Sequence, residues 1–397
     1  MKLSRIASFF LICLLYIIGI TPSEAGSIQG LTDKEIKVGL IQCTSGPIGP
    51  DGQPLVNGVT DYFKYVNEQG GIHGRKIKLY HEDDQFQTPK ALAAFNKLWF
   101  RDKIFTMVAE GGVAQTLALL PQMARHNLVS LVGGGSQAYV EPFNPTLFLP
   151  QASYKEQIFV MFDYIVNDLG DKKPEVGIVY AETQFGKDGL MAARERAKQY
   201  GVKLVAELVL PMFAVDATSQ VLSLKKAGAK YVLNCSYATA MVSMFKACDD
   251  LGYYPYLLAI NLQTDDFLFL EPRKSAEKFI GVHFFHMWNE DVPIMGLARK
   301  IFKKYDREHT TRQNYYTWGF GIAKVFEEGL KRAGRDLTLD KLRAGLESLK
   351  QYKDSPYAPL TFTSTNHKGS STLNVVKADV KTKRFISLGW RDPLELQ

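Results

Sequence analysis

The chain has 397 residues, of which 46% are hydrophobic and 22% are charged, and its formal net charge is +7. A chain of this length can bury a large core and is expected to divide into two domains. Its lysines and arginines are spread along the sequence instead of forming a basic stripe, so the charge predicts a solvated surface and argues against nucleic acid as a partner.

The first 25 residues have the pattern of a secretory signal peptide. Lys2 and Arg5 precede an apolar stretch at 7–20, which is shorter than the stretch of about 20 residues that spans a bilayer. Ser23-Glu24-Ala25 then forms a small-x-small cleavage site. We therefore expect residues 1–25 to be removed and the mature chain to be periplasmic, with no stable membrane insertion.

Three cysteines follow this segment, and their odd number forbids complete pairing. Each lies in or beside an apolar run, where a free cysteine behaves as a small hydrophobic side chain. Buried free thiols are therefore expected at Cys43, Cys235 and Cys248.

Strands and helices alternate along the first part of the chain. Apolar residues recur at helical spacing, for example at Val56, Val59 and Tyr62, whereas the run Val38-Gly39-Leu40-Ile41 is typical of a buried strand. Pro89 favours a helix start, because its missing N–H is not needed there. The pattern predicts strands at 35–43, 77–81, 105–109 and 128–132, with helices at 54–68, 89–99 and 115–125 between them.

The same alternation restarts after Pro150. It predicts helices at 154–167, 189–200, 219–226 and 240–251, and strands at 176–181, 202–210, 231–235 and 256–260. A third section departs from this order, with a strand at 279–285, helices at 294–305, 316–333 and 339–349, and a β-rich tail at 360–388. Strands alternating with helices indicate parallel sheets covered on both faces, so the predicted fold class is α/β with two doubly wound lobes.

Residues 128–136 read Leu-Val-Ser-Leu-Val-Gly-Gly-Gly-Ser, a strand that runs directly into three glycines and a hydroxyl. Ligands of open α/β sheets bind in the crevice at the carboxyl ends of the strands. Glycine permits a positive φ and lets a ligand approach backbone N–H groups, so the sequence favours this segment as the floor of a binding site. The alternative is a tight turn that contacts no ligand.

The most specific motif in the chain is Asn67-Glu68-Gln69-Gly70-Gly71-Ile72-His73-Gly74. Thr44-Ser45-Gly46-Pro47, His81-Glu82-Asp83-Asp84 and Phe185-Gly186 accompany it in a matching order and spacing. Together these motifs resemble the type I periplasmic solute-binding proteins of the leucine/isoleucine/valine-binding group, and the similarity extends over nearly the whole mature chain.

The resemblance implies two lobes joined by a three-strand hinge. Lobe 1 would combine residues 30–149 and 283–359, and lobe 2 would combine residues 150–282 and 360–397. It also implies a monomeric protein that traps a small molecule between its lobes and delivers it to the membrane permease of an ABC importer. No enzymatic activity, cofactor or metal is expected.

The resemblance further assigns the ligand contacts. Two loops of lobe 1, which hold a ligand carboxylate in the relatives, correspond to Gly112, Val113, Gly134, Gly135 and Ser136. Lobe 2 is expected to cover the ligand with the aromatic side chains of Phe185, Tyr237 and Tyr154. Val113 stands where the relatives usually offer a hydroxyl, and this departure weakens the case for an α-amino acid.

The charges of these candidates favour a ligand without an ammonium group. Asn261 falls near the position where amino-acid binders carry the neutralising acid, and an amide has no charge. Burying an unpaired ammonium costs several kcal/mol. We therefore expect a small hydrophobic or aromatic carboxylate, or another uncharged apolar ligand, with Gln115 and Gln263 as further polar candidates. If Asp51 supplies the missing acid, the alternative is a branched-chain or other apolar amino acid.

Two other functions remain open from the sequence. Residues 134–138 are similar to a nucleophile elbow, which would make Ser136 the nucleophile of a hydrolase, but they lack the second glycine of G-x-S-x-G. His283 and His286 lie three residues apart on a predicted strand, hence on opposite faces, and are poor joint metal ligands. The second alternative is a protein that presents its ligand to a membrane-bound sensor.

Overall fold

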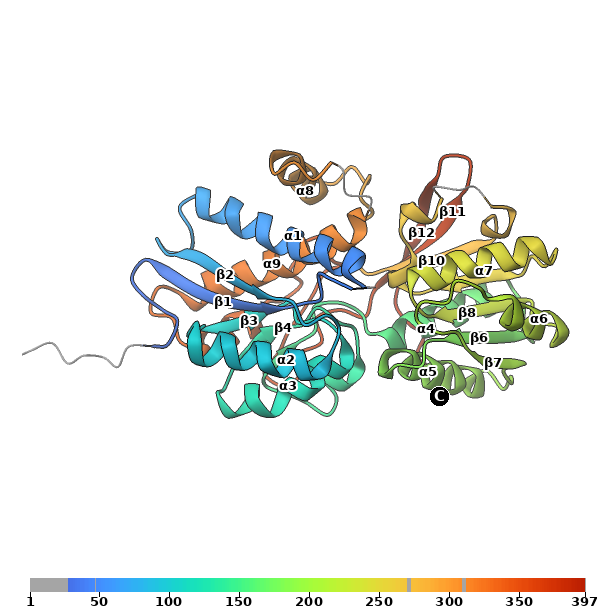
Figure 1. Cartoon of the computed structure of the whole chain (residues 1–397), viewed down its shortest axis with the longest axis horizontal. Helices are drawn as coiled ribbons and strands as arrows, with labels where there is room; N and C mark the ends of the chain where they lie inside the picture. The colour runs from blue at the N-terminus through green and yellow to red at the C-terminus, as the bar shows by residue number, and fades with distance from the viewer. Residues whose placement is uncertain (1–27, 47, 270–272, 309–311, 397) are drawn as a thin grey trace, which may run out of the picture.

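The computed structural model describes residues 28–46, 48–269, 273–308 and 312–396, so the signal peptide predicted for residues 1–25 lies outside the described residues. The described residues form two α/β lobes that lie side by side along the longest axis of the molecule (Figure 1). Each lobe contains one sheet with helices packed against it, as the alternation of strands and helices predicts.

The sheet of lobe 1 has five parallel strands in the order β2-β1-β3-β4-β5. The strands are β1 (Glu35–Ile41), β2 (Lys76–Glu82), β3 (Thr106–Val108), β4 (Ser130–Leu131) and β5 (Leu147–Phe148). The helices of this lobe are α1 (Gly49–Glu68), α2 (Thr88–Asn96), η1 (Lys97–Arg101), α3 (Val113–Arg125), η2 (Gln137–Tyr139), α8 (Pro293–Lys304), α9 (Gln313–Ala333) and α10 (Leu339–Glu347). In Figure 1, α1 and α9 lie on one side of the sheet, and α2 and α3 lie on the other.

Helices α1 and α9 are in backbone contact, although they are far apart in the sequence. A Cβ atom on Gly58 would lie 2.2 Å from the carbonyl oxygen of Tyr316, and one on Gly319 would lie 2.0 Å from that of Leu55. Only glycine fits at these two crossing points. The close packing brings the N-terminal ends of both helices to the same side of lobe 1.

The sheet of lobe 2 has seven strands in the order β12-β11-β10-β9-β8-β6-β7. The strands are β6 (Val176–Tyr180), β7 (Ala206–Val209), β8 (Tyr231–Cys235), β9 (Tyr256–Ala259), β10 (Phe279–His283), β11 (Leu373–Asp379) and β12 (Arg384–Arg391). The helices are α4 (Tyr154–Asp163), η3 (Tyr164–Asp168), α5 (Gln184–Gln199), α6 (Thr218–Lys226), α7 (Ala238–Asp250), η4 (Asn261–Gln263), η5 (Asp266–Phe269) and η6 (Lys274–Ala276). Strands β6 to β10 are parallel, but β11 is antiparallel to β10 and to β12. The β-rich tail therefore makes this sheet mixed, because a short turn joins β11 to β12 and allows only antiparallel pairing.

Strand β8 shows why this sheet is covered on both faces. Tyr231 and Leu233 pack in the apolar cluster that contains α4 and α5, whereas Val232, between them, packs in the cluster that contains α6 and α7. Successive side chains of a strand point to opposite faces, so a continuous apolar run requires a helix layer on each side.

Three segments connect the two sheets: one after β5, one after β10 and one before β11. The first and third are paired, since the N–H of Leu149 donates to the carbonyl of His367 at 2.9 Å and that of Gly369 donates to the carbonyl of Leu149 at 2.8 Å. A bridge between Phe285 and Tyr357 joins the second and third segments. The chain thus passes between the lobes through mutually bonded segments, as expected of a three-strand hinge.

Several predicted element boundaries are wrong. The helices predicted at 115–125 and 189–200 begin earlier, at Val113 and Gln184. In the first turn of α5 only Phe185 is a large apolar residue, so hydrophobic spacing does not reveal this turn. The Thr183 hydroxyl caps α5 by accepting from the Gly186 N–H at 3.3 Å. The strands predicted at 128–132 and 202–210 are shorter, at Ser130–Leu131 and Ala206–Val209.

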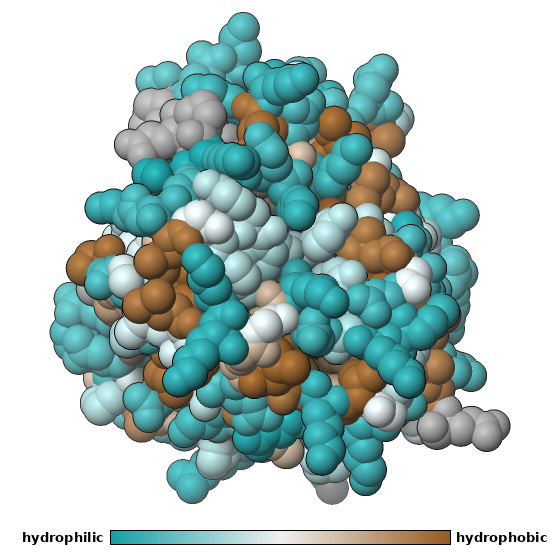
Figure 2. All heavy atoms as spheres, turned by 90° about the vertical axis from the view of Figure 1, so that its right-hand side faces the viewer, coloured by the Kyte–Doolittle hydropathy of each residue, from teal (hydrophilic) through white to brown (hydrophobic). Residues whose placement is uncertain are grey.

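The three cysteines after residue 25 are free and buried, as predicted for Cys43, Cys235 and Cys248. The end of lobe 2 that faces the viewer in Figure 2 is mostly hydrophilic, and its apolar side chains form small separate groups. Within the described part of the chain, no helix combines the length and apolar character needed to cross a membrane.

Candidate functional site

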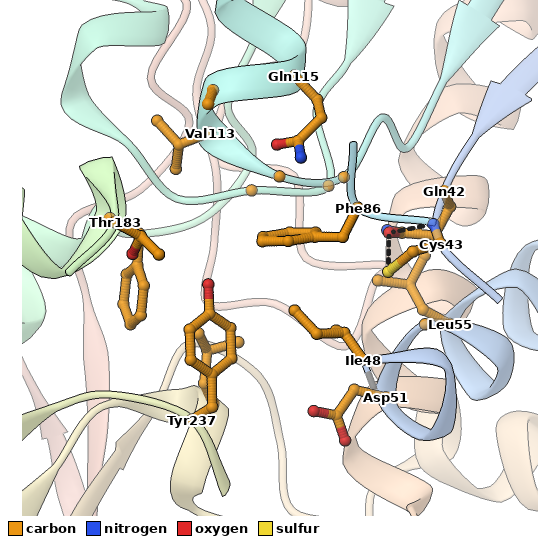
Figure 3. A pocket seen from close by; sticks show the side chains of 18 of the residues that line it. Gln42, Cys43, Ile48, Asp51, Leu55, Phe86, Val113, Gln115, Thr183 and Tyr237 are labelled. Carbon is orange, nitrogen blue, oxygen red and sulfur yellow. Dashed lines mark hydrogen bonds between the residues drawn. The ribbon is translucent and has the colours of Figure 1, made fainter. Parts of the chain in front are cut away.

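A cavity of about 370 Å³ lies between the two lobes. Lobe 1 contributes the loops after β1, β2, β3 and β4 together with the first turns of α1 and α9, and lobe 2 contributes the segments at the starts of α5 and α7. In Figure 3, Val113 and Phe86 from lobe 1 and Tyr237 from lobe 2 project into this space. Its size is that of a site for a small molecule, which needs about 300 to 1,000 Å³.

The polar wall of the cavity is formed by Gly111, Gly112 and Val113 together with Gly133 and Gly134. Gly112 precedes α3 with φ 79° and ψ 127°, a conformation that glycine adopts without strain. The N–H groups in the first turn of a helix have no partner within the helix, and they carry its partial positive charge. The start of α3 therefore offers donors to an anionic group.

The structure separates the predicted Gly134-Gly135-Ser136 segment into two parts. Gly134 lines the cavity, but Gly135 and Ser136 are not among the residues that line it. Gly135 packs against Tyr154 and accepts from its N–H at 2.7 Å, and the hydroxyl of Ser136 donates to Asp188 Oδ2 at 2.7 Å. The Ser136 hydroxyl thus points to Asp188 and does not line the cavity, because the chain turns into η2 after Gly134.

The aromatic half of the site contains all three predicted side chains of lobe 2. Phe185 makes edge-on ring contacts with Tyr154 at 4.9 Å and with Tyr237 at 5.3 Å between centroids. Tyr237 also meets Phe86 of lobe 1 at 6.3 Å, so aromatic rings approach each other across the cavity. Tyr154, Phe185 and Tyr237 all line the cavity, which is the geometry that suits a small apolar ligand.

Sequence reasoning missed much of the lining. The unexpected members include apolar and aromatic side chains from α1, α9 and the loops: Ile48, Leu55, Phe86, Met212, Leu262, Tyr315 and Trp318. Tyr315 and Trp318 lie three residues apart on one face of α9, a spacing equally typical of core packing. Among the neutral candidates, Gln115 lines the cavity, whereas Gln263 is buried elsewhere and donates to Asn234 Oδ1 at 2.8 Å.

Asp51 is the only acidic side chain among the described residues that line the cavity. It is already paired, because Arg312 Nη1 lies 2.9 Å from its Oδ1. Burial raises the pKa of Asp51, and the Arg312 guanidinium opposes this shift.

Asn261 is buried but does not line the cavity; its N–H donates to Gln157 Oε1 at 2.9 Å. The predicted position for an ammonium-binding acid is therefore both uncharged and outside the cavity wall.

The nucleophiles near the site are not activated. Ser136 bonds to a carboxylate and not to a histidine. Burial raises the pKa of the Cys43 thiol, which lines the cavity, to about 12, so the thiol is protonated at neutral pH. Across the described ranges, no group of three or more His, Cys, Asp or Glu side chains is arranged to hold a metal ion.

Comparisons with known proteins agree on the family of this chain. Residues 35–384 match the model of a family described as periplasmic binding protein. The Leu/Ile/Val-binding protein homolog 8 of Brucella suis biovar 1 is 26% identical over 248 residues, which cover 60% of this chain and 60% of that protein. An amino acid binding protein of Pseudomonas aeruginosa is 26% identical over 218 residues, which cover 54% of this chain and 58% of that protein. The matches thus span less than two thirds of these relatives.

Solved structures share the fold at low sequence identity. A branched chain amino acid ABC transporter protein from Thermus thermophilus with bound valine has a TM-score of 0.84 and 23% identity, and covers 92% of this chain and 97% of its own. A fatty acid ABC transporter substrate-binding protein from Thermomonospora curvata has a TM-score of 0.82 and 20% identity, covering 91% and 92%. The family model spans most of the sequence and the two-lobed fold agrees with it, so the chain belongs to the periplasmic binding protein family.

Proposed function

We propose that this chain is a periplasmic, monomeric solute-binding protein, not an enzyme, that delivers its ligand to the permease of an ABC importer. The ligand is a small, largely apolar molecule with one anionic group, such as an aliphatic or aromatic carboxylate. The observation that carries this proposal is the two-sided cavity, in which the glycine loops and the start of α3 face aromatic rings of lobe 2.

The distribution of charge supports a ligand without an ammonium group. The acid in the cavity wall, Asp51, already has Arg312 as a partner, and Asn261 is neutral. A ligand ammonium would have to compete with the guanidinium for one carboxylate, and an ammonium left unpaired in this space would cost several kcal/mol. A carboxylate avoids this cost, because it meets backbone donors at the start of α3.

The alternative ligand is a branched-chain or other apolar amino acid, and one observation favours it: the carboxylate of Asp51 does reach the cavity. Relatives offer both chemistries, since one structural neighbour is described with bound valine and another as a fatty acid ABC transporter substrate-binding protein. Ligand presentation to a membrane sensor would use the same binding site and differ only in the partner.

Matched ligand pairs separate these two classes. We would compare compounds that share one apolar group but differ in the head group: 3-methylbutanoate with leucine and 3-methylbutylamine, and 3-phenylpropanoate with phenylalanine. A ligand at 100 times its Kd stabilises the folded chain by about 2.7 kcal/mol, which thermal unfolding detects. We expect the carboxylates without an amino group to raise the melting temperature most. Tight binding of the amino acids alone, abolished by Asp51→Asn, would contradict the proposed ligand class.

Mass spectrometry of the recovered ligand tests the absence of catalysis. The bound compound should be released unchanged and in a one-to-one ratio after prolonged incubation. Chemical conversion of the ligand would favour the hydrolase alternative, and Ser136→Ala would then have to abolish it.

A further inference from the structure

One hydrogen bond joins the two lobes beside the cavity without lining it. The Ser136 hydroxyl, in the loop after β4 of lobe 1, donates to Asp188 Oδ2 on α5 of lobe 2 at 2.7 Å. The other carboxylate oxygen, Oδ1, accepts from Gln184 Nε2 at 2.8 Å. Ser136 is 1% exposed, so its hydroxyl is held away from solvent. Both oxygens of Asp188 are therefore occupied and its orientation is fixed.

Ser136 and Asp188 each lie close in the chain to residues that line the cavity. Ser136 follows the glycines of which Gly134 lines the cavity, and Asp188 lies one turn along α5 from Gln184 and Phe185, which also line it. The bond therefore connects the polar wall of lobe 1 to the aromatic wall of lobe 2. Neither Ser136 nor Asp188 is among the lining residues, so the pair does not compete with a ligand.

We propose that Ser136 and Asp188 form an interlobe latch that stabilises the closed lobes and so sets the apparent affinity for the ligand. When the lobes separate, the hydroxyl and the carboxylate each bond to water instead of to each other. The bond therefore stabilises only the closed conformation. A hydrogen bond to a charged acceptor is stronger than one between neutral groups. Since apparent affinity scales with the population of the binding-competent state, a contact remote from the ligand changes Kd.

This role is measurable without any ligand. Small-angle X-ray scattering of the ligand-free protein should give a larger radius of gyration for Ser136→Ala and for Asp188→Ala than for the wild type. Asp188→Asn keeps an acceptor but loses the charge, so it should fall between. A matched control is Ser223→Ala, whose hydroxyl bonds to the Ser219 carbonyl within α6 and reaches no other lobe. Unchanged scattering of both latch variants would overturn the proposal, whatever the ligand is.

A second experiment measures ligand binding; it rests on the proposed function and uses the compound from the matched pairs that binds most tightly. Ser136→Ala and Asp188→Ala should each raise Kd roughly 10-fold, mainly through faster dissociation. The loss of affinity in the double variant should be smaller than the sum of the two single losses, because the bond that the two residues share is removed only once. A loss for Ser136→Ala with none for Asp188→Ala would mean that the serine acts independently of Asp188, through the ligand or through its bond to the Ala138 N–H, and would overturn the latch. If no compound binds, the proposed ligand class fails and the scattering still decides the latch.

Discussion

Gly112→Ala tests whether the start of α3 holds the ligand head group. Gly112 has φ 79°, and a Cβ atom there would lie 2.2 Å from Gln115 Oε1 and 3.1 Å from Phe86 Cε2. The positive φ costs an alanine about 1 to 2 kcal/mol, and overpacking adds about 1 to 3 kcal/mol. Both neighbours line the cavity, so relieving the clash displaces the site itself. We expect lower stability in urea unfolding and at least roughly 10-fold weaker binding by calorimetry, as for a lost hydrogen bond to a charged ligand group.

Gly170→Ala is the matched control, because Gly170 has φ 75° but no atom within 4 Å of the added Cβ. Gly170→Ala should lower the free energy of unfolding only by the cost of the positive φ, about 1 to 2 kcal/mol, and should leave the ligand affinity unchanged. If Gly112→Ala loses no more stability than this control and binds the ligand as tightly as the wild type, the start of α3 is not the head-group site.

Three further predictions concern the fold around the site. Arg196→Met should lower the free energy of unfolding, measured in urea, by about 3 to 5 kcal/mol, because it leaves buried Asp163 without the guanidinium that bonds its Oδ1 at 2.7 Å. As a control, Arg194→Ala, which breaks an exposed pair with Glu207, should lower it by less than about 1 kcal/mol. Burial raises the pKa of Glu110 to about 7, so between pH 4.5 and 7 the folded state binds a proton that the unfolded state has lost. The free energy of unfolding of the wild type should therefore fall, relative to that of Glu110→Gln, as the pH rises from 4.5 to 7. An alkylating reagent at pH 8 should label Cys43 only after unfolding, because burial raises the pKa of its thiol to about 12. Rapid labelling of Cys43 in the folded protein would contradict this and would show that the cavity is open to solvent.

The position of Ser136 shows that a motif can lead to the cavity while one of its side chains bonds elsewhere. The glycine-rich segment does reach the ligand cavity through Gly134. The hydroxyl two residues later belongs to the lobe interface, where Asp188 accepts its hydrogen bond. A serine beside a site can therefore influence binding in two ways, and the double variant with Asp188 distinguishes them.

Local sequence patterns determined the secondary structure, the fold class and the family. Short apolar runs predicted β1 and β8, helical spacing predicted α1, and the Asn67–Gly74 motif indicated the family. These features depend on neighbours in the chain, so they are readable without coordinates. The aromatic candidates Phe185 and Tyr237 were also predicted from the resemblance, and both line the cavity.

Only the tertiary structure decided which side chains meet between the lobes. Tyr315 and Trp318 reach the cavity because Gly58 and Gly319 let α1 and α9 touch, and nothing local distinguishes them from core residues. The pairing of Asp51 with Arg312, far away in the sequence, decides the charge of the site. The sequence by itself determined two lobes and a crevice, because local periodicity specifies elements. The lining and its charge come from long-range packing, which periodicity does not encode.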